Sequence, residues 1–230
     1  MLVSKLYPRG GGRLMEYPII YFHRFYRILP PIVLLLGFYM TLFQYIGDGP
    51  IYPVVTQASY EACDEYWWTI MVFISNMVPW TIGEECFWWL WYMANDMQFF
   101  WITPPLIYLY IKNRRAGHLA FIFLVILSIL ANILVTVKYE LGISNNDGPS
   151  PKGVFYADEI YIKPWTRVGV YAFGVLTGIF HWESKNHEKY PHLHGTLPSR
   201  IMFQLKVSPW LPYVFLFTGA FLTMFCIFIV

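Results

Sequence analysis

Long apolar stretches alternate with short polar ones along this chain, and their lengths are typical of membrane-spanning helices. A helix that spans a bilayer needs roughly 20 mostly apolar residues. Five stretches approach that length, and each carries one charged residue or none. They are residues 28–46, 87–111, 119–137, 168–182 and 207–230. The pattern predicts an all-α, multi-pass transmembrane protein with about five spans.

A further apolar stretch, residues 67–80, is only 14 residues long and is interrupted by Asn76 and Pro79. That length is short for a span, so we expect a short re-entrant or interfacial helix there. Its tryptophans, Trp67, Trp68 and Trp80, fit an aromatic belt at the level of the lipid headgroups.

Composition agrees with a lipid environment. The chain is 57% hydrophobic and 13% charged, whereas a soluble domain has about 25% charged residues. So few charges cannot coat a water-exposed surface, and the expected partner is the lipid bilayer. The net charge of +2 gives no reason to expect a nucleic-acid partner.

Charge is sorted between the predicted loops. The loops 47–86 and 138–167 hold ten acids and four of the 16 basic residues, and the other 12 basic residues belong to the opposite side. By the positive-inside rule, residues 1–20 form a cytoplasmic N-terminal segment, and residues 112–118 and 183–206 are cytoplasmic. We expect a multi-pass protein of the plasma membrane or an endomembrane.

Two of the three cysteines, Cys63 and Cys86, share the non-cytoplasmic loop 47–86. An oxidising compartment permits a disulfide between them, and the alternative is two free thiols near the membrane. Cys226 lies in the last predicted span, where we expect inert packing.

The second predicted span carries Asn95, Asp96 and Gln98 near its start. An ionised carboxylate inside a bilayer costs several kcal/mol (roughly 3) unless it faces a partner or water. We expect this end of the helix to border a polar cavity, with Asp96 and Asn95 in a functional role and Gln98 beside them. The alternative is a structural carboxylate bonded to a neighbouring helix. The expected cavity walls are Trp89, Tyr92 and Phe99.

Basic residues provide a second candidate site. His23, Arg24 and Arg27 precede the first predicted span, and two arginines three apart share one helix face. They either anchor the helix at the membrane surface or grip a phosphate group. Arg167 opens the fourth predicted span, where it either pairs with Asp96 or is a site residue.

No metal site is expected. His187, His192 and His194 have a spacing that matches no usual zinc site, so we expect a solvated loop there. We find no phosphate-binding glycine loop and no serine nucleophile motif, and we expect no permanently bound cofactor.

Four stretches together resemble nose resistant to fluoxetine proteins. They are "YFHRFYRILPP", "CDEYWWTIMVFISN", "CFWWLWYMANDMQFF" and "YIKPWTRVGVYAFGVLTG". The Asn-Asp-Met-Gln-Phe core of the third stretch is the most specific, and the fourth departs from the family pattern at Trp165 and Val170. The stretches follow the family order over residues 21–230.

That resemblance implies a type 3 membrane acyltransferase domain over residues 21–230. Such proteins transfer an acyl group, typically from a coenzyme A thioester, to a hydroxyl of a sugar or lipid-like acceptor. The resemblance assigns donor binding to the segment with His23, Arg24 and Arg27, and it makes Asp96 the carboxylate of the cavity. We expect Asp96 to orient a donor, base or acceptor hydroxyl rather than to act as a nucleophile.

The resemblance also implies a histidine base in an early helix that the aligned stretches do not include. The chain starts at what resembles the third helix of the family and ends inside a predicted span, so we expect a fragment that is inactive alone. Two other functions are kept open: a lipid or small-molecule transporter and a non-catalytic membrane subunit.

Overall fold

The computed structural model describes residues 16–142 and 148–186, and all regular elements within them are helices. The elements are α2 (Glu16–Thr41), η2 (Phe43–Tyr45), α3 (Tyr52–Met71), η3 (Trp88–Leu90), α4 (Trp91–Lys112), α5 (Arg114–Tyr139), η5 (Ala157–Tyr161) and α6 (Pro164–Asn186). The chain divides into two compact units after Phe173. The predicted all-α class is confirmed for the described residues.

Two of the described helices are long and apolar enough to cross a membrane. They are Pro18–Thr41, which is most of α2, and Arg114–Tyr139, which is α5. Helix α4 is long enough at 22 residues, but its polar side chains keep it out of this class. The count of five spans is therefore not supported, and the stretch 207–230 lies outside the described residues.

The helices extend beyond the predicted spans at several ends. Helix α2 begins at Glu16 instead of residue 28 and ends at Thr41 instead of residue 46. The apolar pattern marked only the charge-free part, whereas the helix continues through Arg24 and Arg27 and through two prolines. Helices α4, α5 and α6 contain most or all of their predicted spans.

The prediction of a separate short helix at residues 67–80 is wrong. Helix α3 starts at Tyr52 and ends at Met71, so only the first part of that stretch is helical. The chain then turns through Phe73, which has a positive φ of 58°. The pattern hid α3 because acidic residues occupy its middle. Most of them are exposed, so an apolar count could not mark this helix.

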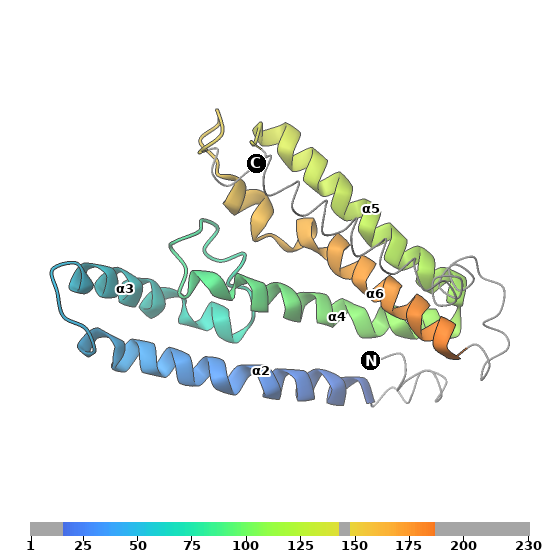
Figure 1. The fold of residues 1–230 in the computed structure, drawn as a ribbon, viewed down its shortest axis with the longest axis horizontal. Helices are drawn as coiled ribbons and strands as arrows, with labels where there is room; N and C mark the ends of the chain where they lie inside the picture. Colours follow the sequence, from blue (N-terminus) through green and yellow to red (C-terminus); the bar gives the residue numbers. More distant parts are fainter. Residues whose placement is uncertain (1–15, 143–147, 187–230) are drawn as a thin grey trace, which may run out of the picture. The chain divides into compact units, whose positions relative to one another are not determined.

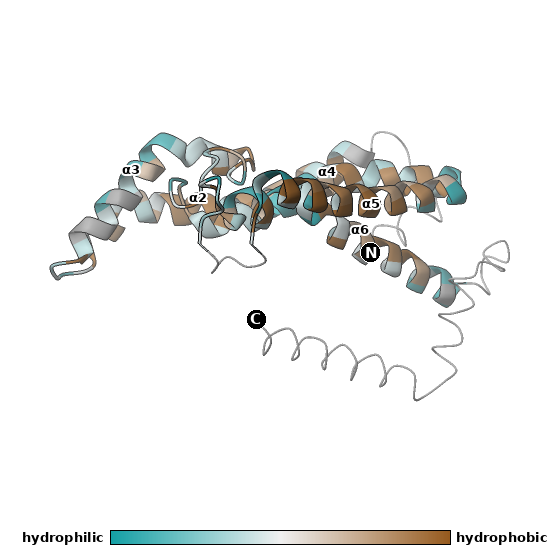
Figure 2. Ribbon diagram, turned by 90° about the horizontal axis from the view of Figure 1, so that it is seen from above, coloured by the Kyte–Doolittle hydropathy of each residue, from teal (hydrophilic) through white to brown (hydrophobic). Residues whose placement is uncertain are grey.

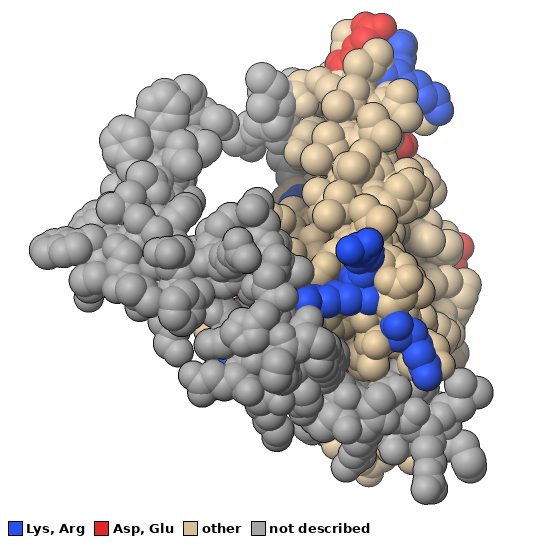
Figure 3. All heavy atoms as spheres, turned by 90° about the vertical axis from the view of Figure 1, so that its right-hand side faces the viewer, with Lys and Arg blue, Asp and Glu red and all other residues tan. Residues whose placement is uncertain are grey.

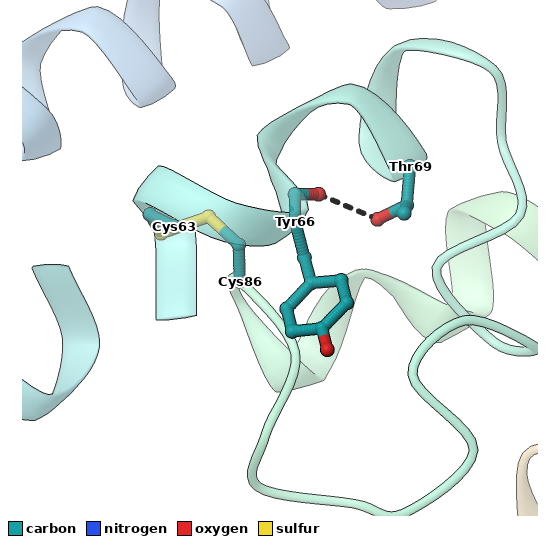
Figure 4. The surroundings of a disulfide bond; sticks show 4 residues. All are labelled: Cys63, Tyr66, Thr69 and Cys86. Carbon is teal, nitrogen blue, oxygen red and sulfur yellow. Dashed lines mark hydrogen bonds between the residues drawn. A yellow bond between two sulfur atoms is a disulfide. The ribbon is translucent and has the colours of Figure 1, made fainter. Parts of the chain in front are cut away.

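Helices α2 and α3 form a hairpin around an apolar core (Figure 1). The core includes Ile28, Ile32, Leu36, Cys63, Ile70, Phe73 and Phe87. A disulfide joins Cys63 of α3 to Cys86 in the segment before α4, and the predicted pairing is confirmed. Figure 4 shows the bond beside the last turns of α3, where the Thr69 hydroxyl donates to the Tyr66 carbonyl. The bond holds the segment that leads into α4 against the hairpin.

Helices α4 and α5 form a second hairpin with Asn113 as its only linking residue. The Asn113 side chain caps α5 by accepting a hydrogen bond from the Ala116 N–H. Gly117 lies against Tyr110, and a Cβ at Gly117 would be 2.3 Å from the Tyr110 Cα. Only glycine allows the two backbones to approach this closely at the corner.

Helix α5 exposes a long row of apolar side chains. They include Leu119, Ile122, Phe123, Ile126, Leu130, Ile133, Leu134 and Val137. Figure 2 shows the same helix as hydrophobic over most of its length, in contrast to α3. At about 1.5 Å per residue, its 26 residues exceed the bilayer core of about 30 Å. Lipid is the solvent that suits this surface.

Candidate functional site

Arg24 of α2 and Asp96 of α4 form an ion pair. The Arg24 Nη2 donates to the Asp96 Oδ2, and the two side chains are 22% and 26% exposed. The guanidinium carbon lies 4.1 Å from the centroid of the Phe100 ring, which adds a cation–π contact. The carboxylate of α4 therefore has a partner on a neighbouring helix.

This pair lies near the first end of the candidate membrane span of α2, Pro18–Thr41. Arg24 comes six residues after Pro18, the start of the apolar stretch, which is about 9 Å along a helix. One turn earlier, the Tyr21 hydroxyl donates to the Trp101 carbonyl. The Tyr21 ring also meets the Phe100 ring edge-on. These contacts fix the register of α2 against α4 and hold both charged groups opposite each other.

The Arg24 guanidinium keeps hydrogen-bonding capacity. Its Nε atom is buried and donates to no acceptor within the residues that the structure describes. A guanidinium has five N–H donors in a planar fork, and a buried donor without an acceptor costs about 1–3 kcal/mol. An oxygen atom of a ligand at this position would remove that cost.

Three amide side chains form a closed cluster beside the ion pair. The Asn76 Nδ2 donates to the Asn95 Oδ1 at 2.8 Å and to the Gln98 Oε1 at 3.1 Å. The Gln98 Nε2 donates back to the Asn76 Oδ1 at 2.8 Å and also to the Phe73 carbonyl. The Asn95 Nδ2 donates to the Ile162 carbonyl. Each amide therefore has protein partners.

This cluster corrects the expectation that all three polar residues of α4 border a water-filled cavity. Asn95 is 3% exposed and Asn76 is fully buried. The two amides of α4 bind protein groups because the turn after α3 brings Asn76 back against this helix. Of the expected walls, Tyr92 is exposed and Phe99 packs against Tyr171.

Lys163 lies next to the cluster and is fully buried. Its Nζ donates to the carbonyls of Asn76 and Trp80, and it lies 3.7 Å from the centroid of the Trp80 ring. Burial lowers the pKa of Lys163 from 10.5 to about 8, although the carboxylates of Glu159, Asp158 and Glu85 oppose the shift. The ammonium group thus holds the turn after α3 against the segment before α6.

Two acids complete this attachment. The Trp80 Nε1 donates to the Glu159 Oε1 at 2.8 Å. The Ile82 N–H donates to the Asp158 Oδ1 at 2.7 Å. Both acids are buried on η5, a single π-helical turn. Residues 157–163 therefore fix the loop that carries Asn76, and through Asn76 they fix the start of α4.

Arg167 does not pair with Asp96 in the structure. Its Nε donates to the Tyr161 carbonyl at 2.8 Å, and its guanidinium carbon lies 4.6 Å from the Tyr161 ring centroid. The π-helical turn η5 places Tyr161 beside Arg167, while α2 brings Arg24 to Asp96. Of the two alternatives for Arg167, the pairing with Asp96 is not formed, and the charge of Asp96 is balanced from α2.

The predicted donor-binding group is only partly brought together. Arg24 faces α4, whereas His23 and Arg27 are exposed on α2. Gln98 belongs to the amide cluster, and Arg167 belongs to the η5 turn. Within the described residues, no group of three or more metal-ligating side chains has a geometry suited to a metal ion. His187, His192 and His194 lie outside those residues.

Sequence reasoning missed the central residues of the cluster, Asn76 and Lys163. Asn76 was noted only as an interruption of an apolar stretch, and Lys163 only as part of the "YIKPWT" motif. The sequence did contain a signal for Lys163. It stands between apolar residues and a Pro-Trp pair, so few arrangements of this segment would expose its ammonium group to water. Its partners are main-chain carbonyls, which no side-chain pattern reveals.

Comparison with known proteins gives two relatives, both from Caenorhabditis elegans. Nose resistant to fluoxetine protein 6 is 27% identical over 174 residues, which cover 70% of this chain and 20% of that protein. Regulator of hypoxia-inducible factor 1 is 25% identical over 166 residues, which cover 64% of this chain and 32% of that protein. No family model matches the chain, and no solved structure matches it.

The chain spans between a fifth and a third of the length of these relatives. The predicted resemblance is confirmed at the level of sequence, whereas a family model for type 3 acyltransferases does not match. Over most of its length, this chain is similar to the nose resistant to fluoxetine proteins.

Proposed function

We propose that this chain is part of an integral membrane acyltransferase-like protein that transfers an acyl group from an acyl-coenzyme A donor to a hydroxyl of a lipid or carbohydrate acceptor. The observation that carries the proposal is the Arg24–Asp96 pair, which joins α2, a helix apolar enough to cross a membrane, to α4. Ionisable groups inside a membrane are costly and mark substrate paths by default. The similarity to nose resistant to fluoxetine protein 6 supports the class.

Arg24 is the donor-binding residue in this proposal. Asp96 engages one edge of the guanidinium and Phe100 lies against one face of it, so the fork is held in a fixed orientation. The buried Nε–H then points to an oxygen of the donor, either a phosphate or the thioester carbonyl. A fixed, always-charged fork suits such oxygens better than the flexible point charge of lysine.

Asp96 acts as a positioning residue in this scheme. Its carboxylate accepts a hydrogen bond from the Arg24 guanidinium, so it orients Arg24. The histidine base that the resemblance implies would belong to a part of the protein beyond the stretches aligned here. Acyl transfer needs that base within hydrogen-bond reach of the acceptor hydroxyl.

The donor approaches from the cytoplasm in this proposal, and the protein crosses the membrane several times with its N-terminus inside. Basic side chains support this orientation. Lys112, Arg114 and Arg115 flank the α4–α5 corner without any acid between them. Figure 3, which views the described residues from the side of that corner in Figure 1, shows Lys and Arg side chains gathered on this face. The positive-inside rule assigns such a corner to the cytoplasm.

A test with charge exchange separates a functional pair from a structural one. Arg24→Asp with Asp96→Arg keeps an ion pair between α2 and α4 but moves the guanidinium to the other helix. We expect normal insertion and folding, yet a loss of at least about tenfold in acyl-coenzyme A consumption by the full-length protein with acceptor present. Arg115→Lys, at the exposed α4–α5 corner, is the control and should keep full activity.

Other outcomes would reject the proposal. Full turnover in the exchanged variant would return the pair to a purely structural role. No acyl-coenzyme A consumption by the unmodified full-length protein, with any hydroxyl acceptor tried, would favour a transporter or a non-catalytic subunit.

A further inference from the structure

A small cavity lies between α2, α3 and the segment before α4, beside the Cys63–Cys86 disulfide. Its volume is about 130 Å³. Four aromatic side chains line it: Tyr39, Phe87, Trp88 and Trp89. Glu85 provides a carboxylate in the same lining. The cavity has no part in the proposed acyl transfer, because its lining does not include Arg24 or Asp96.

The lining rings pack against one another: Phe87 stacks on Trp89, with centroids 5.2 Å apart and planes at 29°. Tyr39 and Phe87 meet edge-to-face, with centroids 4.7 Å apart and planes at 76°. Trp88 and Trp89 also meet edge-to-face, at 6.0 Å and 81°. Phe87 is 4% exposed and forms part of the base, while Trp88 and Trp89 are about half exposed. The cavity is therefore aromatic at its base and at its rim.

Glu85 is almost fully buried at 6% exposure. Its Oε2 accepts a hydrogen bond from the Gly83 N–H at 2.6 Å, which fixes the carboxyl group. Burial raises the pKa of the Glu85 carboxyl above its usual range. A buried carboxylate gains most from a cation that enters with it, because the cation offsets the loss of hydration.

The surroundings of the cavity favour cations over anions. Residues 47–86 contain six acids and no lysine or arginine. The five besides Glu85 are exposed: Asp48, Glu61, Asp64, Glu65 and Glu84. Glu61, Asp64 and Glu84 are next to lining residues in the sequence, and charges of one sign raise the local concentration of ligands of the opposite sign. A metal ion is a poor candidate, because Glu85 is the only carboxylate in the lining and the described residues hold no metal-binding group of three.

We propose that this cavity binds a trimethylammonium group, as found in choline and in the headgroup of phosphatidylcholine. Aromatic cages with a nearby carboxylate suit quaternary ammonium ions, which interact with ring faces and have no N–H to hydrogen-bond. An apolar cavity of about 150 Å³ accepts benzene, so one of 130 Å³ suits the slightly smaller, rounded trimethylammonium group.

Binding of radiolabelled choline to the full-length protein in phosphatidylglycerol nanodiscs tests the proposal. We expect saturable binding that unlabelled choline and tetramethylammonium displace. The neutral isostere 3,3-dimethyl-1-butanol has the same shape without the charge, so it should compete at least about tenfold less well. Absence of saturable choline binding, or equal competition by the neutral isostere, would overturn the proposal.

Matched variants localise the site. Glu85→Gln keeps an acceptor for the Gly83 N–H but removes the charge, and it should weaken choline binding by about tenfold or more. Glu84→Gln changes the exposed neighbouring acid and should have little effect. Trp89→Leu at the rim should also weaken binding, whereas Trp67→Leu, equally exposed on α3, should not. If Glu85→Gln does not fold, the two tryptophan variants still decide.

The same assay separates the two sources of the group. If the natural ligand is the lipid headgroup, nanodiscs of phosphatidylcholine should suppress choline binding relative to phosphatidylglycerol nanodiscs. If the ligand is free choline or a related soluble cation, binding should be equal in both. Both results agree with the proposed chemistry. If the Glu85→Gln and Trp89→Leu variants bind choline as well as the unmodified protein does, any choline site lies elsewhere and this cavity is rejected.

Discussion

The glycine at the α4–α5 corner gives a sharp test of how closely the two helices pack. In Gly117→Ala, the new Cβ would lie 2.3 Å from the Tyr110 Cα and 2.8 Å from its main-chain nitrogen. Carbon atoms in contact are about 3.5–4.0 Å apart, so the two backbones must separate by more than about 1 Å. The atoms that the new methyl group meets belong mainly to the backbone, which has no free rotamer to escape into.

The structure also sets the size of the effect and its controls. Alanine stabilises a helix interior by about 0.5–1 kcal/mol relative to glycine, and Gly37 of α2 has no atom within 4 Å of a built Cβ. Gly37→Ala should therefore be neutral or slightly stabilising. Gly117→Ala should lose that gain and about 1–3 kcal/mol or more for overpacking. Gly169→Ala should fall between them, because its Cβ would meet the Ser128 side chain at 2.7 Å.

The assay is thermal unfolding of the detergent-solubilised protein, followed as the loss of the monodisperse peak in size-exclusion chromatography. We expect the melting temperature to fall in the order Gly37→Ala, Gly169→Ala, Gly117→Ala. A Gly117→Ala variant as stable as Gly37→Ala would show that α4 and α5 do not approach as the structure has them.

Three further predictions concern the loops before α4 and α6. Burial lowers the pKa of Lys163 to about 8, so the unfolded chain holds this proton more tightly than the folded protein does. Between pH 8 and 10.5, the free energy of unfolding should therefore rise by about 3 kcal/mol relative to that of Lys163→Met. A pH-independent difference between the two unfolding free energies would contradict this. Replacing Cys63 and Cys86 by serine should lower the free energy of unfolding by roughly 3 kcal/mol, because the disulfide no longer closes its loop. Peptide mapping of the unmodified protein without reductant should recover the two cysteines as a linked pair. Recovery of both cysteines as free thiols would contradict the bond. Choline affinity should fall as pH drops below the raised pKa of Glu85, because the protonated carboxyl no longer attracts the cation. The charge of Asp158 raises this pKa and the charge of Lys163 lowers it. Choline affinity that stays constant down to pH 4 would refute this linkage.

Much of the fold follows from the sequence because hydrophobic length and cysteine placement are local signals. The helical class, the positions of α4, α5 and the described α6, and the disulfide Cys63–Cys86 were all predicted. Helix α3 was missed because its exposed acids interrupt the apolar pattern. Its stability comes from one buried face against α2 and from the disulfide, neither of which a window average detects.

The candidate site was predicted less completely, because its partners are far apart in the sequence. Asp96 was identified as unusual from its surroundings alone, but its partner, Arg24, is 72 residues away on α2. The sequence suggested Arg167 as a possible partner, and only the packing of α2 against α4 shows that Arg24 takes this place. Lys163 is held by main-chain carbonyls, which carry no identity in the sequence. Asn76 is held by the side-chain amides of Asn95 and Gln98, which are 19 and 22 residues away along the chain.

The contrast between Asp96 and its neighbours explains why the start of α4 carries three polar residues. Asn95 and Gln98 point toward the loop of Asn76, where their hydrogen bonds to protein groups make the entry of water unnecessary. Asp96 points toward α2, where an arginine balances its charge and still has a buried donor without an acceptor in the described residues. An amide network of this kind gives rigidity, whereas the buried Nε–H of Arg24 is the donor that we propose a ligand oxygen would engage. The amide cluster therefore positions α4, and the ion pair is the part of this helix from which chemistry is expected.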